Sequence, residues 1–352
     1  MMGKNKKILY TCTASLLLLI LIVYVLVVAK SFLAPLTVAI ILTLLLAPIV
    51  RKLEQWNVPK NLAALLTTLA SLLVSFGFFL LVIVQTNNVV EQWDTIQETM
   101  QPKIVNATDF LIENTPVTQK KIDGLKNKLS SFRILGSTKQ ANSAVTYLSS
   151  IVNFLGIYLL VFIYIFFMLR FRLKFKKFIL KFFDDEQQSE VKSTLQQITN
   201  VAQGYLIGKL KLIGILAVVY SIGLGISGVN NFILVALISA LLTIIPYLGN
   251  VIGYCLALIF GYLVQGDMSV LIGVSVTFVV AQFIESYILQ PYIIGNDVDV
   301  NPFFVILAVI ASNLIWGVAG MVVAIPILGI INVVFLHVPG LKPFGFLIKK
   351  TE

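Results

Sequence analysis

The sequence predicts an all-α polytopic membrane protein with about six full transmembrane helices and two broken or re-entrant helical hairpins in an inverted-repeat-like C-terminal half. Hydrophobic residues make up 58% of the chain and charged residues only 12%, with a mean hydropathy of +0.95. A soluble domain needs more surface charge of both signs than this composition supplies. From Leu212 to Leu341 the chain contains no Lys or Arg, and its carboxylates are Asp267, Glu285, Asp297 and Asp299.

Residues 1–86 are predicted to form three transmembrane helices. The first apolar run, Ile8–Ala29, follows three lysines. At a rise of 1.5 Å per residue, about 22 residues cross a hydrocarbon core of about 30 Å. This run exceeds the apolar core of a cleavable signal peptide, so we expect it to be retained as a span. Phe32–Val50 and Asn61–Thr86 are the second and third spans.

Residues 87–147 are much more polar and are predicted to be an extracytoplasmic helical loop. Residues 148–211 then combine a fourth span, Leu148–Leu169, with a basic amphipathic cytoplasmic connector. From Arg170 to Lys181, cations alternate with phenylalanines at helical spacing, a pattern that favours contact with anionic lipids. Aromatic and basic residues also alternate in single-strand nucleic-acid binders, but the adjoining span favours the membrane, and we expect no nucleic-acid partner.

Residues 212–341 are predicted to be the transport core, and residues 342–352 a cytoplasmic tail. Two apolar runs in the core fit one span each, whereas Phe232–Leu263 and Pro302–Leu336 are too long for a single crossing. A hairpin that enters and leaves on one side accounts for each long run. A span followed by a hairpin then occurs twice in opposite orientation, as in secondary transporters with a site between broken helices.

The distribution of cations predicts the orientation of the chain. More Lys and Arg residues fall on the side of the N-terminus than on the opposite side. By the positive-inside rule, this asymmetry predicts a multi-pass protein of the cell (plasma or inner) membrane with both termini cytoplasmic.

Each long apolar run contains residues that are typical of an unwound turn. The first has Pro246, Gly249 and Gly253, and the second has Gly317 and Gly320. Proline removes a backbone donor and glycine permits positive φ, so we expect both groups to mark hairpin breaks. Close helix packing through small residues is the alternative, but packing does not explain the excess apolar length.

Glu285 is the only carboxylate within a predicted span, and Gln282 lies one helical turn before it. A buried ionised carboxylate is costly without a compensating cation or donor, and the core contains no Lys or Arg. We therefore expect a passing Na⁺ or proton as its partner, with the amides of Gln282, Asn250 and Asn313 completing the shell if the two breaks converge. The alternative is a solvated carboxylate near the helix end.

Neither an enzymatic site nor a cofactor is expected from the sequence. Gly225-Ile-Ser227-Gly228 matches a short motif of intramembrane serine proteases, but His337, the only histidine, lies past the last apolar run and cannot serve as its base. With one histidine and two separated cysteines, Cys12 and Cys255, no zinc site arises. No Gly-Lys-Ser/Thr phosphate-binding loop is present to power a pump. Transport, if it is the function, must therefore use a gradient or run downhill.

Several separated motifs of the C-terminal half together resemble the AI-2E family of transporters. They are Ile244 to Gly253, Gln282 to Glu285, Gln290-Pro291 to Gly295, Asn301-Pro302 and Trp316 to Met321, followed by Ile325-Pro326. The resemblance implies a homo-oligomeric permease that exports a small polar solute such as the quorum-sensing molecule autoinducer-2, or exchanges Na⁺ for H⁺. Asn250 departs from the proline expected in many relatives. A non-transporting membrane scaffold or interaction protein remains the alternative function.

Overall fold

The computed structural model describes residues 4–91, 102, 141–265, 267–294 and 299–350. These residues form helices and turns and no strand, which confirms the predicted all-α fold. The predicted outer loop lies outside the described residues except for residue 102 and the helix ends at either side. Six described helices are long and apolar enough to cross a membrane: Lys30–Gln55, Lys60–Leu80, Ile151–Leu180, Gln188–Ile226, Met268–Ile293 and Val318–His337. Val318–His337 is an addition to the predicted full spans, and the predicted first span lies within the 25-residue helix Lys4–Val28, whose apolar part includes Thr13–Val28.

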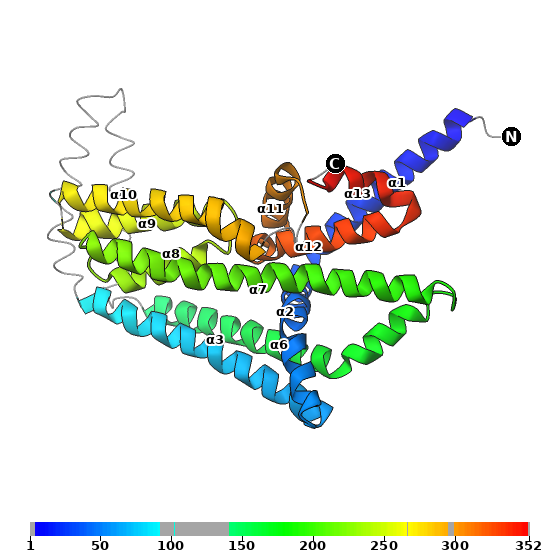
Figure 1. The fold of residues 1–352 in the computed structure, drawn as a ribbon, viewed down its shortest axis with the longest axis horizontal. Coiled ribbons are helices and arrows are strands. Elements are labelled where there is room, and N and C mark those ends of the chain that lie inside the picture. Colours follow the sequence, from blue (N-terminus) through cyan, green and yellow to red (C-terminus); the bar gives the residue numbers. More distant parts are fainter. Residues whose placement is uncertain (1–3, 92–101, 103–140, 266, 295–298, 351–352) are drawn as a thin grey trace.

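The N-terminal half comprises helices α1 (Lys4–Val28), α2 (Lys30–Gln55), α3 (Lys60–Glu91) and α6 (Ala141–Leu180). Helix α2 runs across the direction of α3 and α6 in Figure 1. The three helices pack around the buried side chains of Ile165 and Leu169. Tyr158 of α6 shares a 2.5 Å hydrogen bond with Ser75 of α3, which links the two helices within this apolar contact.

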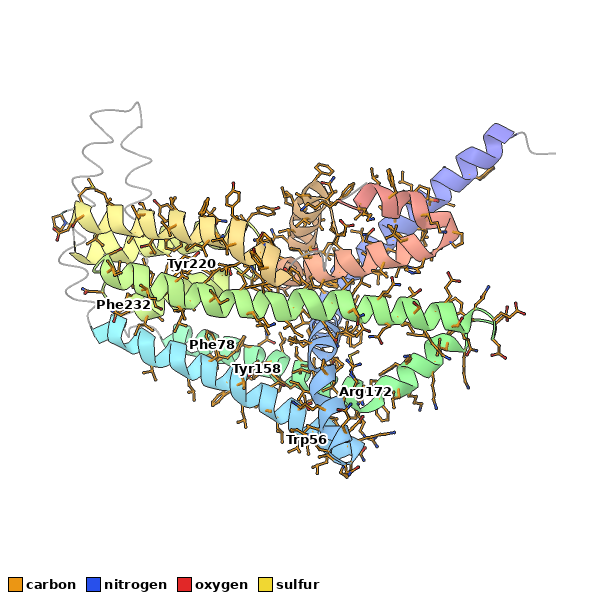
Figure 2. All side chains as sticks on the ribbon, in the orientation of Figure 1. Trp56, Phe78, Tyr158, Arg172, Tyr220 and Phe232 are labelled. Atoms are coloured by element: carbon orange, nitrogen blue, oxygen red, sulfur yellow. The ribbon has the colours of Figure 1, made fainter. Side chains whose placement is uncertain are left out.

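The predicted fourth span and the start of the basic connector form one helix, α6, which contains no Pro and continues past its single glycine, Gly156, to Leu180. The last part of α6 turns towards the start of α7 (Gln188–Ile226) in Figure 1. Arg172 of α6 forms an ion pair with Glu54 of α2, and Figure 2 shows it beside the end of α2. Arg172, one of the cations of the basic segment, therefore contacts another helix of the protein. Helix α7 likewise joins the connector to the fifth span, so the predicted division at 211/212 falls inside it.

Both long apolar runs of the C-terminal half are broken into two helices, as predicted. The first hairpin consists of α8 (Phe232–Leu242) and α9 (Leu248–Gln265), and the second of α11 (Pro302–Trp316) and α12 (Val318–His337). Between them lies α10 (Met268–Phe283), which continues into a π-helical segment η2 (Ile284–Ile294). The chain ends with the short η3 (Pro339–Leu341) and α13 (Lys342–Ile348).

The two long helices that precede the hairpins, α7 and α10 with η2, are antiparallel. The side chain of Ser227 approaches Thr277 at one end of the pair, and Lys209 approaches Glu285 at the other. Between these points, the ring of Tyr220, which is labelled in Figure 2, stacks on Phe278 with centroids 4.6 Å apart. A long helix followed by a hairpin thus occurs twice with opposite directions, which agrees with the predicted inverted-repeat-like arrangement.

Candidate functional site

The break in the first hairpin is a short turn between α8 and α9. Tyr247 within it has a φ of 63°, an uncommon conformation for a non-glycine residue. A Cβ on Gly249 would lie 1.7 Å from the carbonyl oxygen of Leu242. Only glycine therefore allows α9 to begin directly against the end of α8, and this close approach fixes the position of the next residue, Asn250.

Asn250 reaches across to the junction of α10 and η2. Its Nδ2 donates to Oε2 of Glu285 at 2.9 Å and also to Oε1 of Gln282. Gln282 in turn donates from Nε2 to the hydroxyl of Ser286 at 2.9 Å. The Oδ1 atom of Asn250 is buried and has no hydrogen-bond partner among the described residues. Three of the four residues predicted to bind a solute or ion therefore lie together.

Glu285 has a basic partner, contrary to the expectation from the sequence. Nζ of Lys209 lies 3.7 Å from Oε1 of Glu285, and their side chains are 11% and 3% exposed. The separation is too long for a good hydrogen bond but short enough for an ion pair. The expectation was wrong because α7 extends well upstream of the cation-free stretch and places Lys209 within the core. Because Glu285 is buried, the alternative of a solvated helix-end carboxylate is also wrong.

The ion pair opens onto a cavity of about 600 Å³, which we call the polar cavity. Helix α7, the first break, η2, the second hairpin and the C-terminal tail all contribute to its wall. The lining residues are Tyr205, Lys209, Thr243, Pro246, Tyr247, Asn250, Val251, Gln282, Glu285, Ser286, Gln290, Val300, Pro302, Val305, Ile325 and Lys350. Pro246 of the predicted break therefore faces the same space as Glu285.

The second break does not join this site. Asn313 is exposed on α11 and does not line the polar cavity. At the break, Gly317 adopts a φ of 62°, and the neighbouring Trp316 donates from Nε1 to the carbonyl of Leu26 in α1 at 3.0 Å. The second hairpin meets the first further along its length, where Val309 and its neighbours pack on Ile245. Convergence of the two breaks, the condition under which Asn313 would complete the shell of Glu285, is therefore not met.

The remaining predicted break residues lie within helices. Gly253 packs against Ser239 across the first hairpin, where a Cβ would meet that side chain at 3.1 Å. Gly320 lies against the backbone of Ser312 across the second hairpin. Small-residue packing, the alternative interpretation, therefore describes these two glycines, whereas Pro246 and Gly317 occupy the breaks themselves.

Sequence reasoning missed Lys209 and Tyr205, although a signal for both is present. Tyr205, Lys209, Leu212 and Leu216 follow each other at intervals of three or four residues on one face of α7, and all four are buried. A lysine that takes an apolar-face position of a helix requires a partner. Lys211, two residues away, lies on the exposed side.

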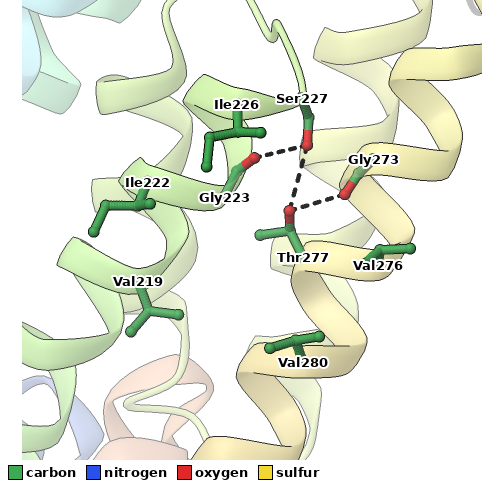
Figure 3. A pocket seen from close by; sticks show the side chains of 9 residues that line it. All are labelled: Val219, Ile222, Gly223, Ile226, Ser227, Gly273, Val276, Thr277 and Val280. Carbon is green, nitrogen blue, oxygen red and sulfur yellow. Dashed lines mark hydrogen bonds between the residues drawn. The ribbon is translucent and has the colours of Figure 1, made fainter.

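A second hollow, of about 470 Å³, lies between α7 and α10 (Figure 3). Its few polar side-chain atoms are already satisfied, since Ser227 donates to the carbonyl of Gly223 and Thr277 donates to that of Gly273. The rest of the wall is apolar, with Ile222 and Val276 more than half exposed. This groove therefore presents a surface suited to hydrocarbon and lacks the free donors and acceptors of the polar cavity.

A family model described as AI-2E family transporter matches residues 16–340. The chain belongs to the AI-2E family of transporters. Its relatives include the "Putative transport protein YrrI" of Bacillus subtilis, 23% identical over 88% of this chain and 87% of the relative. Another is the "Putative transport protein MT0215" of Mycobacterium tuberculosis, 24% identical over 88% of this chain and 84% of the relative. The resemblance seen in the sequence is confirmed: this is a multi-pass membrane protein of a transporter family, which is not an enzyme class.

Within the AI-2E chain, the site combines a neutralised charge pair with spare hydrogen-bonding groups. Glu285 is held by Lys209 on one oxygen and by Asn250 on the other. A cation, a proton or a solute donor that approaches Glu285 must compete with one of these two partners. Among the described residues, no group of three His, Cys, Asp or Glu is placed to hold a metal ion.

Proposed function

We propose that the protein is a secondary transporter that moves a small polar solute through the polar cavity. The size of this cavity carries the proposal. Its volume of about 600 Å³ lies within the roughly 300–1,000 Å³ of small-molecule sites, whereas one water takes about 30 Å³. Such a space accommodates a solute of several heavy atoms and far exceeds the need of a bare ion.

The contacts of Asn250 favour the first hairpin as the moving part. The amide of Asn250 belongs to the hairpin, whereas Glu285 and Gln282 belong to the long helix α10 and its continuation. A solute that offers its own donor to Glu285 replaces the Asn250 contact and releases the hairpin from the helix. Binding and opening are then coupled by one hydrogen-bond exchange, and the energy comes from a gradient.

Purified protein in liposomes, assayed for autoinducer-2 flux, tests this function. We expect Glu285→Gln to abolish flux while the protein still reaches the membrane, because the amide cannot hold Lys209 as a carboxylate does. Glu285→Asp should retain part of the flux. Asp267→Asn, which neutralises an exposed carboxylate at the start of α10, is the matched control and should transport normally. Parental flux in Glu285→Gln would place the site elsewhere.

The ion pair favours a second candidate function, exchange of Na⁺ for H⁺. A Na⁺ or a proton that binds Glu285 competes with Lys209 for the same carboxylate, so occupancy by either ion loosens the pair. Na⁺-dependent proton movement, followed with a pH dye inside liposomes that hold no organic solute, tests this exchange. Proton movement that is independent of Na⁺ excludes it.

A scaffold function, the remaining alternative, gives no role to a buried ion pair that lines a cavity. If the protein were only a scaffold, neither flux assay would show activity above empty liposomes, and its interactions would tolerate Glu285→Gln. Flux above background in either assay excludes a purely structural role.

The membrane placement is also proposed: cell membrane, both termini cytoplasmic, residues 87–147 outside, and assembly with further copies of the chain. Anionic lipids are proposed to contact the segment from Arg170 to Lys181, whose phenylalanines Phe171, Phe175 and Phe178 are exposed. In a variant lacking Cys12 and Cys255, a cysteine at position 120 should be labelled from outside and one at position 350 from the cytoplasm. The reverse pattern contradicts this placement.

A further inference from the structure

The C-terminal tail is docked beside the polar cavity by three kinds of contact. The backbone N–H of Asn301 donates to the backbone carbonyl of Ile348 at 2.8 Å. Nζ of Lys349 lies 3.6 Å from a carboxylate oxygen of Asp299. The side chain of Ile348 is buried with Val300 and Leu328 at the base of the second hairpin. A tail held by backbone, charge and apolar contacts together has a defined position.

This position brings a cation to the cavity. Lys350, directly after the anchored residues, lines the same cavity as Glu285 and Lys209. Lys209 and Glu285 offset each other's charge, so Lys350 is the remaining charged side chain among the described residues of the wall. Lys350 is also exposed, so it borders the part of the cavity wall that solvent reaches.

We propose that the tail is part of the transport site and that Lys350 favours small polar solutes carrying a negative charge over cationic ones. The proposal rests on the proposed transport function and adds to it the charge class of the solute. An ammonium at the entrance attracts an anion and repels a cation by the same Coulomb energy, so it biases entry by sign without a shape-specific contact.

The experiment measures the potential at the entrance and does not depend on transport. In a variant lacking Cys12 and Cys255, Val251→Cys places a thiol on an exposed, cavity-lining position of α9. Its rate of reaction is compared for a negatively and a positively charged methanethiosulfonate of similar size. The measured ratio is the rate of the negatively charged reagent divided by that of the positively charged one. We expect this ratio to fall roughly three- to tenfold in Lys350→Gln, because losing the cation slows the negative reagent and speeds the positive one. Lys350→Glu should lower the ratio further.

Two further variants separate charge from docking. Lys342→Gln removes an exposed cation at the start of α13 that does not line the cavity, and it should leave the ratio unchanged. Ile348→Ala changes no charge but removes the apolar anchor of the tail, and it should lower the ratio in the same direction as Lys350→Gln. A ratio that is unaffected by Lys350→Gln, or that responds equally to Lys342→Gln, overturns the electrostatic role. A ratio that is unaffected by Ile348→Ala overturns the docked tail.

Selection of the solute is then measured as flux of lactate and of its neutral amide, each corrected for empty liposomes. Lys350→Gln should reduce flux of the anion relative to that of the amide. Equal reduction of both, or of neither, contradicts the charge preference. Because the labelling ratio needs no flux, a failure of the proposed transport function leaves the measured potential intact and is distinguishable from a failure of this inference.

Discussion

The first and second hairpins of the C-terminal half look alike in sequence, since each is a long apolar run with an asparagine and glycines near its middle. In the structure their breaks have different surroundings. The first lies against α10 and η2 and delivers Asn250 to the buried Glu285. The second lies against α1, where Trp316 contacts Leu26, and leaves Asn313 exposed. A broken helix therefore marks a site only where the break meets a charged or polar partner.

The largest effect is expected from Lys209→Gln, which leaves the carboxylate of Glu285 buried without its cation. Removing one partner of a buried pair costs about 3–5 kcal/mol of folding free energy. Lys211→Gln on the exposed side of the same helix should change stability by less than about 0.5 kcal/mol. Thermal unfolding of both variants in detergent measures the difference. Equal melting temperatures would show that the ion pair of Lys209 and Glu285 does not stabilise the fold.

Asn250→Ala compared with Asn313→Ala tests the contrast between the breaks directly. Asn250 donates to a carboxylate, a bond worth about 1.5–3 kcal/mol, so we expect flux to fall by about tenfold or more. Asn313 faces outward, and its replacement should leave flux unchanged. The flux of the two variants is compared in liposomes that contain equal amounts of protein. An equal loss of flux in both variants would mean that the second break also contacts the transported solute.

Gly249→Ala compared with Gly317→Ala distinguishes steric contact from backbone strain. The new methyl at Gly249 overlaps the carbonyl of Leu242, and we expect a cost of about 1–3 kcal/mol together with displacement of Asn250 and reduced flux. At Gly317 no atom of the described residues lies within 4 Å of an added Cβ, but the φ of 62° strains alanine. That variant should lose stability and keep its flux. Reduced flux with unchanged stability at Gly317 contradicts the contrast.

The smallest effect is expected from Trp316→Phe, which removes the indole hydrogen bond to Leu26 and retains an aromatic ring. One such bond contributes about 1 kcal/mol. Hydrogen exchange near Leu26 should quicken, while exchange at the first break stays as in the parent. Faster exchange at both places would indicate that the two hairpins open together.

Much of the fold follows from sequence features that depend on local chemistry. Apolar length predicted the broken runs, and Asn301 caps α11 by accepting from the amide of Phe303, as expected of an asparagine before Pro302. The proximity of Gln282 to Glu285 follows from helical spacing alone. Such local features predict the ends and breaks of a single helix, but they do not predict which helices contact each other.

The remainder depends on which elements pack together. The pairing of Lys209 with Glu285 spans two helices far apart in the chain, so spacing within either helix does not reveal it. Asn313 shares the chemistry of Asn250, yet α11 turns it away from the cavity. The anchoring of the tail by Asp299 and Val300 likewise arises only when the second hairpin has formed.

The central claim is that Lys209 and Glu285 serve transport as well as stability, and the double variant Lys209→Gln with Glu285→Gln tests it most directly. With neither charge left alone in the core, the melting temperature should return close to that of the parent. Flux per protein in liposomes should stay at the level of empty liposomes, because no carboxylate is left to exchange partners. A double variant that transports at the parental rate would contradict the account and reduce the pair to a structural contact.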